Sequence, residues 1–530
     1  MTMIKYDRKP RFQRLYSGLL GKALDAVFAV AALQLTVCAA TVTLAPPSGT
    51  STNVLALYAG ETSVEIAGPG TVTLNPANTY TGGTTLSGGE LRLSGVSPSG
   101  ASPIGTGALV LSANAQVTGS GTLPNDITAG GNAYFSPDDK ITLTGNSTIS
   151  GTLYITNNTL EVADGNISAN GLYLTEQDVP GYGNYLQSGG AVTLSGNLQL
   201  AYCKGSTTTF TMTGGSFDVG GENVLLYGNK GDATAVSHST IDISGDAVMS
   251  NIGDLYVHQK NPSEATISAN IHDGGRLGFE QAYHSGCHAT VSLSIDGGTL
   301  ANDYYHKSAT RATQRSTWIS ASGVASVRVG PKGATFTTDN GAKAGTAHIA
   351  RAITAEAGEA GETAKGLTFN SGSWAFAAAG NAYEGPTVIK DGAALFLDVN
   401  GTIPSTSTVT VGSGSELCAV GGNKTVSDLV LEKDAILGFG TSASTPYTLT
   451  VTGSLTLPAY AKIALYASNA PGADAVTAAG TYAVLKVPAA CAAALAAVKW
   501  SCATASAGNT YTFSVATEGD TATLSMTIAA

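Results

Sequence analysis

The chain has 530 residues, of which 12% are charged, 43% are hydrophobic and 66 are glycines, and its formal net charge is −11. Typical soluble domains have about 25% charged residues, so the salt-bridged surface helices of ordinary globular proteins are not expected here. The hydrophobic content excludes a disordered chain, and the acidic balance argues against nucleic acid and anionic membranes as partners.

The first 39 residues have the order of a cleaved secretory signal peptide. Six basic residues between Lys5 and Lys22 precede the apolar run 26–38, and cleavage after Ala39 fits the small residues found there. The alternative is an uncleaved anchor, but a membrane span needs about 20 apolar residues, more than this run provides. Cleavage would leave a net charge of −15, and no later segment is long and apolar enough for a transmembrane helix.

Residues 40–465 show the two-residue alternation of short strands with one buried face. Thr71–Leu74, Ile141–Leu143 and Thr209–Met212 are examples, and clusters of Gly, Asn and Ser separate such segments. No helical pattern lies between them, which argues against a fold that alternates strands and helices. We therefore predict an all-β chain.

A glycine turn between two alternating strands recurs between residues 180 and 310. The second residue of the turn falls at Gly190, Gly215, approximately Gly245, Gly275 and Gly298. The number of residues from one glycine turn to the next suits one coil of a parallel β-helix, in which each coil buries its apolar face by stacking on the next. The alternative is a set of two-residue hairpins, which would give an antiparallel sandwich or barrel.

Two distant segments share a longer pattern, N-x-Y-x-G-x-T-x-[LI]. A further strand follows each copy, so the repeats extend over residues 70–111 and 374–411. The matching residues are Asn78, Tyr80, Gly82, Thr84 and Leu86 in the first copy and Asn381, Tyr383, Gly385, Thr387 and Ile389 in the second.

This pattern resembles the autotransporter-associated β-strand repeat, also called the passenger-associated transport repeat. The resemblance implies a right-handed parallel β-helix, export, and an extracellular or cell-surface location. Residues 466–530 do not resemble the C-terminal translocator barrel of that family. We expect them to form a small β-rich cap with one short helix near Pro488–Trp500, and a separate secretion machinery to carry the chain across an outer membrane.

A series of tyrosines is the leading candidate for binding. If equivalent positions stack on successive coils, these rings form either a structural ladder or a flat aromatic strip that binds glycans. The residues are Tyr202, Tyr227, Tyr256, Tyr283 and Tyr305.

Metal and cofactor sites are not expected. All seven histidines lie between residues 238 and 348, and His284, Cys287 and His288 are closely spaced. Zinc needs about four ligands, and no second short cluster supplies the others, so loop histidines are the alternative. Cys491 and Cys502 are close enough in sequence to form a disulfide, with free thiols as the alternative.

These observations predict an exported, non-enzymatic structural or adhesive protein that presents a rigid rod for multivalent binding, with glycans or other surface macromolecules as partners. The alternative is a β-helical polysaccharide hydrolase or lyase. Such enzymes need clustered acids on one face, and Asp138 and Asp139, next to Lys140, are the only adjacent aspartates. Asp residues before glycine turns more often bond their own backbone.

Overall fold

The computed structural model describes two compact units, one made of residues 1–220 with 228–235 and the other of residues 221–227 with 236–530. The predicted signal peptide, residues 1–39, lies outside the described residues apart from a two-residue strand. The described residues are 5–6, 40–74, 78–94, 102–175, 181–203, 205–230, 236–257, 265–284, 290–303, 317–338, 346–356, 366–442, 445–467, 476 and 478–529.

The first unit is a parallel β-helix. Leu109, Ile127, Ser147 and Ile167 lie opposite one another on four successive coils, and the pairing is parallel at each step. Its strands are β1 (Lys5–Tyr6), β2 (Thr41–Leu44), β3 (Ser51–Val54), β4 (Ala59–Gly60), β5 (Ser63–Ile66), β6 (Thr71–Leu74), β7 (Thr79–Tyr80), β8 (Thr84–Leu86), β9 (Glu90–Ser94), β10 (Leu109–Leu111), β11 (Ala115–Leu123), β12 (Ile127–Ala129), β13 (Ala133–Leu143), β14 (Ser147–Ile155), β15 (Asn158–Val162), β16 (Asn166–Tyr173), β17 (Gly183–Gln187), β18 (Ala191–Leu194), β19 (Leu198–Cys203), β20 (Thr207–Met212) and β21 (Ser216–Asp218).

The second unit is built in the same way, and Leu367, Thr387, Val409 and Leu429 mark four of its coils. β22 (Val224–Lys230) contains residues of both units. The solenoid strands of the second unit are β23 (His238–Ile243), β24 (Val248–Val257), β25 (Thr266–His272), β26 (Arg276–His284), β27 (Thr290–Asp296), β28 (Gly298–Asn302), β29 (Thr317–Ile319), β30 (Val324–Val329), β31 (Ala334–Thr338), β32 (Ala347–Ile349), β33 (Ile353–Ala355), β34 (Leu367–Asn370), β35 (Ser373–Phe376), β36 (Thr387–Lys390), β37 (Ala394–Leu397), β38 (Thr408–Val411), β39 (Glu416–Ala419), β40 (Lys424–Val426), β41 (Asp428–Leu431), β42 (Ile436–Phe439), β43 (Thr441–Ser442), β44 (Thr445–Pro446), β45 (Leu449–Val451), β46 (Leu455–Thr456), β47 (Tyr460–Leu465) and β49 (Lys499–Cys502).

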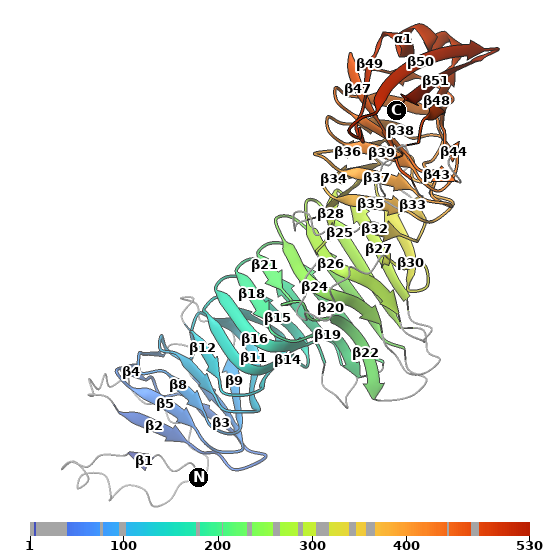
Figure 1. The fold of residues 1–530 in the computed structure, drawn as a ribbon. Coiled ribbons are helices and arrows are strands. Elements are labelled where there is room, and N and C mark those ends of the chain that lie inside the picture. Colours follow the sequence, from blue (N-terminus) through green and yellow to red (C-terminus); the bar gives the residue numbers. More distant parts are fainter. Residues whose placement is uncertain are drawn as a thin grey trace, which may run out of the picture. The chain divides into compact units, whose positions relative to one another are not determined.

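Figure 1 shows the strands of each unit side by side, in the order in which the chain builds its coils. The glycine turns of successive coils also lie next to one another, because Ser216 N–H donates to the carbonyl of Gly190, and Thr299 N–H to that of Gly275. Gly190 has φ of +65°, and a Cβ there would collide with the carbonyl of Gly165 on the coil below. Both the conformation and the close approach of the backbone therefore require glycine.

The prediction of a parallel β-helix is confirmed, and the hairpin alternative for the glycine turns is wrong. Among the strands whose register the structure describes, antiparallel ladders are confined to β1 with β2, the β43–β44 pair, and two pairs near the C-terminus. The other ladders in this part of the chain are parallel, as expected when equivalent strands of successive coils run in the same direction.

The C-terminal part combines the last coils with a small mixed sheet and one short helix. β48 (Gly480–Pro488), β50 (Thr510–Glu518) and β51 (Thr521–Ala529) join β40 and β45 in a five-stranded sheet. A 3₁₀ turn over Ala489–Cys491 leads into α1 (Ala492–Ala497), which buries Leu495. The expected helix is thus present but shorter than Pro488–Trp500. β49 pairs in parallel with β47, so a solenoid strand also lies beyond residue 465.

The core of the second unit contains a column of stacked aromatic rings. Trp318, Phe336, Phe369 and Trp374 are buried, with centroids 5.1 Å apart for Phe336 and Phe369 and 5.2 Å for Trp318 and Trp374. Trp374 also donates its indole N–H to the carbonyl of Ser371 at 2.7 Å. Such rings bury large apolar areas and favour stacked or edge-on contacts at these separations.

No helix in the part of the chain that the structure describes is long and apolar enough to cross a membrane.

Replacing Trp374 by alanine is expected to destabilise the second unit by about 3–5 kcal/mol, because a large cavity opens in the aromatic column. The matched control is Val399→Ala, since Val399 is 65% exposed. Denaturation followed by circular dichroism should show a shift of less than about 0.5 kcal/mol for this control. Equal midpoints for the two variants would contradict the assignment of Trp374 to the core.

Candidate functional site

The first repeat motif is a clamp that joins three coils. The side chain of Asn78 is 1% exposed. Its Oδ1 accepts the N–H of Tyr58 from the preceding coil at 2.9 Å, and its Nδ2 donates to the carbonyl of Pro103 on the following coil at 3.0 Å. An amide is suited to this position because it carries both a donor and an acceptor.

The second motif repeats the clamp with the same geometry. The Oδ1 atom of Asn381 accepts the N–H of Ile353 at 2.8 Å, and its Nδ2 donates to the carbonyl of Thr402 at 2.8 Å. These contacts again reach one coil back and one coil forward. The two segments that share the sequence pattern therefore share a structural role, although they lie in different units.

The tyrosine and threonine of each motif form a buried hydroxyl pair. Tyr80 bonds Thr84, and Tyr383 bonds Thr387 at 2.7 Å between the two hydroxyl oxygens. Burial raises the pKa of both phenols well above the usual value, so they remain protonated. Gly82 completes the first turn, where a Cβ would lie only 2.6 Å from the carbonyl oxygen of Thr62. The motif residues thus specify how coils join.

Asn78→Ala is expected to cost about 2 kcal/mol, because the partly buried N–H of Tyr58 and the buried carbonyl of Pro103 lose their partner together. Hydrogen exchange at the amide of Tyr58 should accelerate more than exchange at remote strands, since stacked coils open locally. Asn53→Ala is the control, because Asn53 is exposed on neighbouring β3. Unchanged exchange at Tyr58 in the Asn78 variant would contradict the clamp.

The predicted tyrosine strip falls mostly on side chains that the structure does not describe. Only Tyr256 has a described side chain, which is half-buried on β24. Tyr305 lies outside the described residues, and the remaining three contribute only backbone. These three are Tyr202, Tyr227 and Tyr283.

The register of the strands aligns part of this series and not the rest. Tyr256 lies opposite Tyr283 on the next coil. On the other side, Leu225 is the residue opposite Tyr256. Tyr227 is therefore two residues out of line, because the length of the connecting segments changes from coil to coil. Whether the aligned pair binds glycans stays a prediction.

A different tyrosine ladder lies on the first unit. Tyr134 and Tyr154 stack with centroids 4.6 Å apart and an interplanar angle of 6°, and Tyr173 meets Tyr154 edge-on at 5.3 Å. All three are half-buried on successive coils in direct register. In the stacked pair the ring faces are turned toward each other, which suits a structural ladder. Its signal in the sequence is the nearly equal spacing of the three tyrosines, which precede the segment where the glycine turn recurs.

The same unit presents a column of exposed hydroxyl side chains, which we call the hydroxyl face. It consists of Thr128, Thr148, Ser168 and Thr193, which pair in register on four successive coils. Beside it runs a ladder of three residues, in which the backbone N–H groups of the second and third donate to the side-chain oxygen of the residue on the coil before, at 2.9 Å and 3.0 Å. This ladder is Asp126, Asn146 and Asn166.

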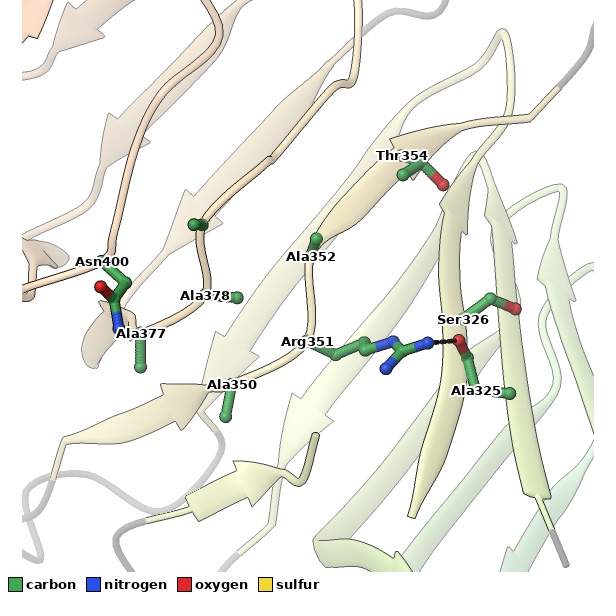
Figure 2. Close-up of a pocket in the computed structure, with 10 residues that line it drawn as sticks. Ala325, Ser326, Ala350, Arg351, Ala352, Thr354, Ala377, Ala378 and Asn400 are labelled. Carbon is green, nitrogen blue, oxygen red and sulfur yellow. Dashed lines mark hydrogen bonds between the residues drawn. The ribbon is translucent and has the colours of Figure 1, made fainter. Parts of the chain in front are cut away.

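A groove of about 500 Å³ opens on the second unit (Figure 2). The segment from Ala350 to Ala352 forms its middle, between β32 and β33. Ala325 and Ser326 of β30 lie on one side, and Ala377, Ala378 and Asn400 on the other. Arg351 reaches across toward β30, where its guanidinium donates to the carbonyl of Ala325. The groove was not predicted, because alanines carry no chemical signal in a sequence.

One of the two aspartates proposed for an enzyme site, Asp138, belongs to a surface network of ion pairs. Asp138 pairs with Arg92, and Lys140 with Glu161 at 2.7 Å. Asp138 and Asp139 are both exposed on β13. Hydrogen bonds to Glu161 outweigh its partial burial and lower its pKa. This arrangement stabilises neighbouring coils and gives no support to a pair of catalytic acids.

The cysteines of the C-terminal part are free thiols. The proposed disulfide between Cys491 and Cys502 is not formed in the structure, where Cys491 ends the 3₁₀ turn and Cys502 ends β49. Cys418 is buried, and desolvation raises the pKa of its thiol, so the nucleophilic thiolate is disfavoured.

An ionic network connects coils around one histidine. His272 contacts Asp273 through Nδ1 at 2.8 Å and Asp242 on the preceding coil through Nε2 at 2.9 Å. Lys332 pairs with Asp273, and its backbone N–H donates to Asp296 at 2.6 Å. Hydrogen bonding to Asp273, followed by that to Asp242, raises the pKa of His272. His284, Cys287, His288 and His306 contribute no described side chains. Among the described residues no group of three His, Cys, Asp or Glu side chains could hold a metal.

The network predicts a pH dependence with a definite sign. Because the folded pKa of His272 is raised above the ordinary value of 6.5, its stabilising contribution is complete below that value and disappears as the pH rises through the folded pKa. Wild type should lose about 0.5–1 kcal/mol relative to His272→Gln between pH 5 and pH 8, the range of a partly exposed pair.

Guanidinium unfolding at both pH values measures this difference. The comparison with the variant is essential, because burial lowers the pKa of His348 and so gives the opposite pH dependence. His348→Gln is the matched control and should retain the contribution of His272. A parallel response of wild type and His272→Gln would contradict the network.

Comparison with known proteins bears on the first clamp. Residues 67–93 match the family model of the passenger-associated-transport-repeat. This segment is an autotransporter passenger repeat. No curated protein and no solved structure matched the chain. The repeat and the parallel β-helix together support an exported β-helical passenger.

Proposed function

We propose that this passenger-type protein is a non-enzymatic structural or adhesive surface protein that binds glycans through many weak contacts. The observation that carries the proposal is the hydroxyl face, where Thr128, Thr148, Ser168 and Thr193 repeat the same exposed group on four coils. Coils lie about 4.8 Å apart, so such a column offers regularly spaced donors and acceptors to a polymer. We further propose that residues 1–39 are a cleaved signal for export.

The weakness of each contact is compatible with firm attachment. A hydroxyl that bonds a sugar displaces water from both groups and gains only about 1 kcal/mol net. When several contacts are fixed on one framework, the later contacts form at high effective concentration, and the overall affinity can rise by a factor of about 10²–10⁴. A solenoid is suited to this because its coils hold equivalent side chains in register.

The neutral character of the face favours sugars over charged partners. Its side chains and the adjacent Asn146 and Asn166 carry no charge, while Asp126 lies beside one end of the column and Asp218 pairs with Thr193 at the other. Neutral hydroxyl and amide groups bond the hydroxyls of sugars without the desolvation cost of an ion. Catalysis receives no comparable support, since the exposed acids of β13 are engaged with or adjacent to basic side chains.

The proposal is tested with beads coated with the purified chain at several densities and exposed to surfaces coated with neutral or acidic polysaccharides. Retention should rise more steeply than linearly with density, because multivalent attachment requires several contacts at once. Replacing Thr128, Thr148 and Thr193 together by valine preserves side-chain volume and β propensity, and should reduce retention at least tenfold.

The control variant replaces Thr79, Thr207 and Thr213 by valine, three exposed threonines of the same unit that lie outside the hydroxyl face. Retention no greater than that of albumin-coated beads on all surfaces would refute adhesion. Release of reducing ends or unsaturated sugars by wild type would instead support the enzyme alternative.

A further inference from the structure

The groove around Arg351 contains a positive charge that differs in its contacts from the arginines of the ion pairs. Arg92 and Arg276 each pair with an aspartate, and the Arg276–Asp303 contact measures 2.8 Å. Arg351 is half-buried and donates instead to the backbone carbonyls of Ala325 and Ala321. Within the described part of the chain, no carboxylate forms an ion pair with it.

The guanidinium retains capacity to bind a ligand. It has five N–H donors in a planar arrangement, and two carbonyl contacts leave donors for another acceptor. Arginine is well suited to carboxylates because two parallel N–H groups can meet both oxygens. A partly desolvated arginine without a carboxylate neighbour is therefore a candidate anchor for an anion from outside the chain.

The walls of the groove favour a sugar ring over a peptide. Methyl groups of Ala350, Ala377 and Ala378 form a shallow apolar surface against which the C–H groups of a ring can pack. The N–H groups of Ala350 and Ala377 already donate to Ile319 and Ile349, at 2.9 Å and 3.0 Å. They are thus not available to a peptide strand, which relies on main-chain hydrogen bonds for attachment.

Polar groups at the rim match the hydroxyls of such a ring. Ser326 and Thr354 lie toward one side of Arg351, and the amide of Asn400 lies across the groove. A hydroxyl group can donate and accept, and so can an amide. The combination of one cation, a methyl-lined surface and neutral polar groups fits a sugar that carries a carboxylate.

We propose that the Arg351 groove binds a uronic acid residue of an acidic glycan, with the sugar carboxylate on the guanidinium and the ring against the alanines. This assignment rests on the proposed glycan-binding function and names one of its ligands. Binding weakens with salt, because the groove is open and the ion pair is partly exposed to solvent.

The proposal is tested by titrating the full chain with tri-galacturonate in calorimetry, and with the same trisaccharide after reduction of its carboxylates to primary alcohols. We expect the acidic sugar to bind at least tenfold more tightly than the reduced one. Arg351→Ala should weaken acidic binding at least tenfold, and Arg351→Lys should weaken it less. Arg328→Ala is the matched control, since Arg328 is exposed on β30, and should remain within twofold of wild type.

A filling variant separates loss of the site from loss of the fold. Arg351 holds two backbone carbonyls, so its removal could loosen β30. Ala378→Trp keeps the arginine and occupies the groove, and should also abolish binding while the thermal midpoint stays within about 2 °C of wild type.

Three results would overturn the proposal: no binding of tri-galacturonate, equal binding of the reduced trisaccharide, or full binding by Ala378→Trp. Equal binding of a tri-aspartate peptide would overturn the choice of sugar over peptide. Retention of coated beads by neutral polysaccharide is independent of this groove. Adhesion that survives in Arg351→Ala would preserve the proposed function even if the groove proposal failed.

Discussion

The structure depends on the pairing of each strand with its equivalents on the coil before and the coil after. A parallel strand cannot satisfy its backbone groups within its own coil, so every coil needs its neighbours, and stability arises at the contacts between coils. Pairing in register also places equivalent side chains above one another. Buried aromatic rings, buried hydroxyls and exposed threonines form columns for this single reason. The arrangement of side chains on the surface therefore follows from the hydrogen bonding of the backbone.

The clamps show how the chain fixes this pairing where a coil turns. Asn78 and Asn381 each use both ends of one amide, so a single side chain sets the position of the coil on either side. A ladder of strand hydrogen bonds fixes the register along the strand, but it leaves the turns less constrained. The buried asparagine supplies that constraint, and because it is desolvated, an incorrect stack would leave its polar atoms unsatisfied.

Much of the fold could be predicted from the sequence, because alternation and glycine turns are local properties. The motif residues around Tyr80 and Tyr383 were also predictable, since two copies of one long pattern imply one structural role. The alignment of the tyrosine strip was harder to predict, because coil lengths vary and spacing in sequence does not give register. The position of Leu225 opposite Tyr256 shows this. The Arg351 groove could not be predicted from the sequence, because its shape depends on how neighbouring coils pack against one another and the alanines that line it carry no chemical signal.

The reach of the clamp sets a minimum length of chain below which this part of the β-helix cannot close. Asn78 bonds residues 58 and 103, so the first clamp forms only when the whole interval between them is present and free to fold. A segment that stops before residue 103 leaves the buried amide of Asn78 without its acceptor on the following coil. The native stack around the first motif is therefore established over three coils together, and not one coil at a time.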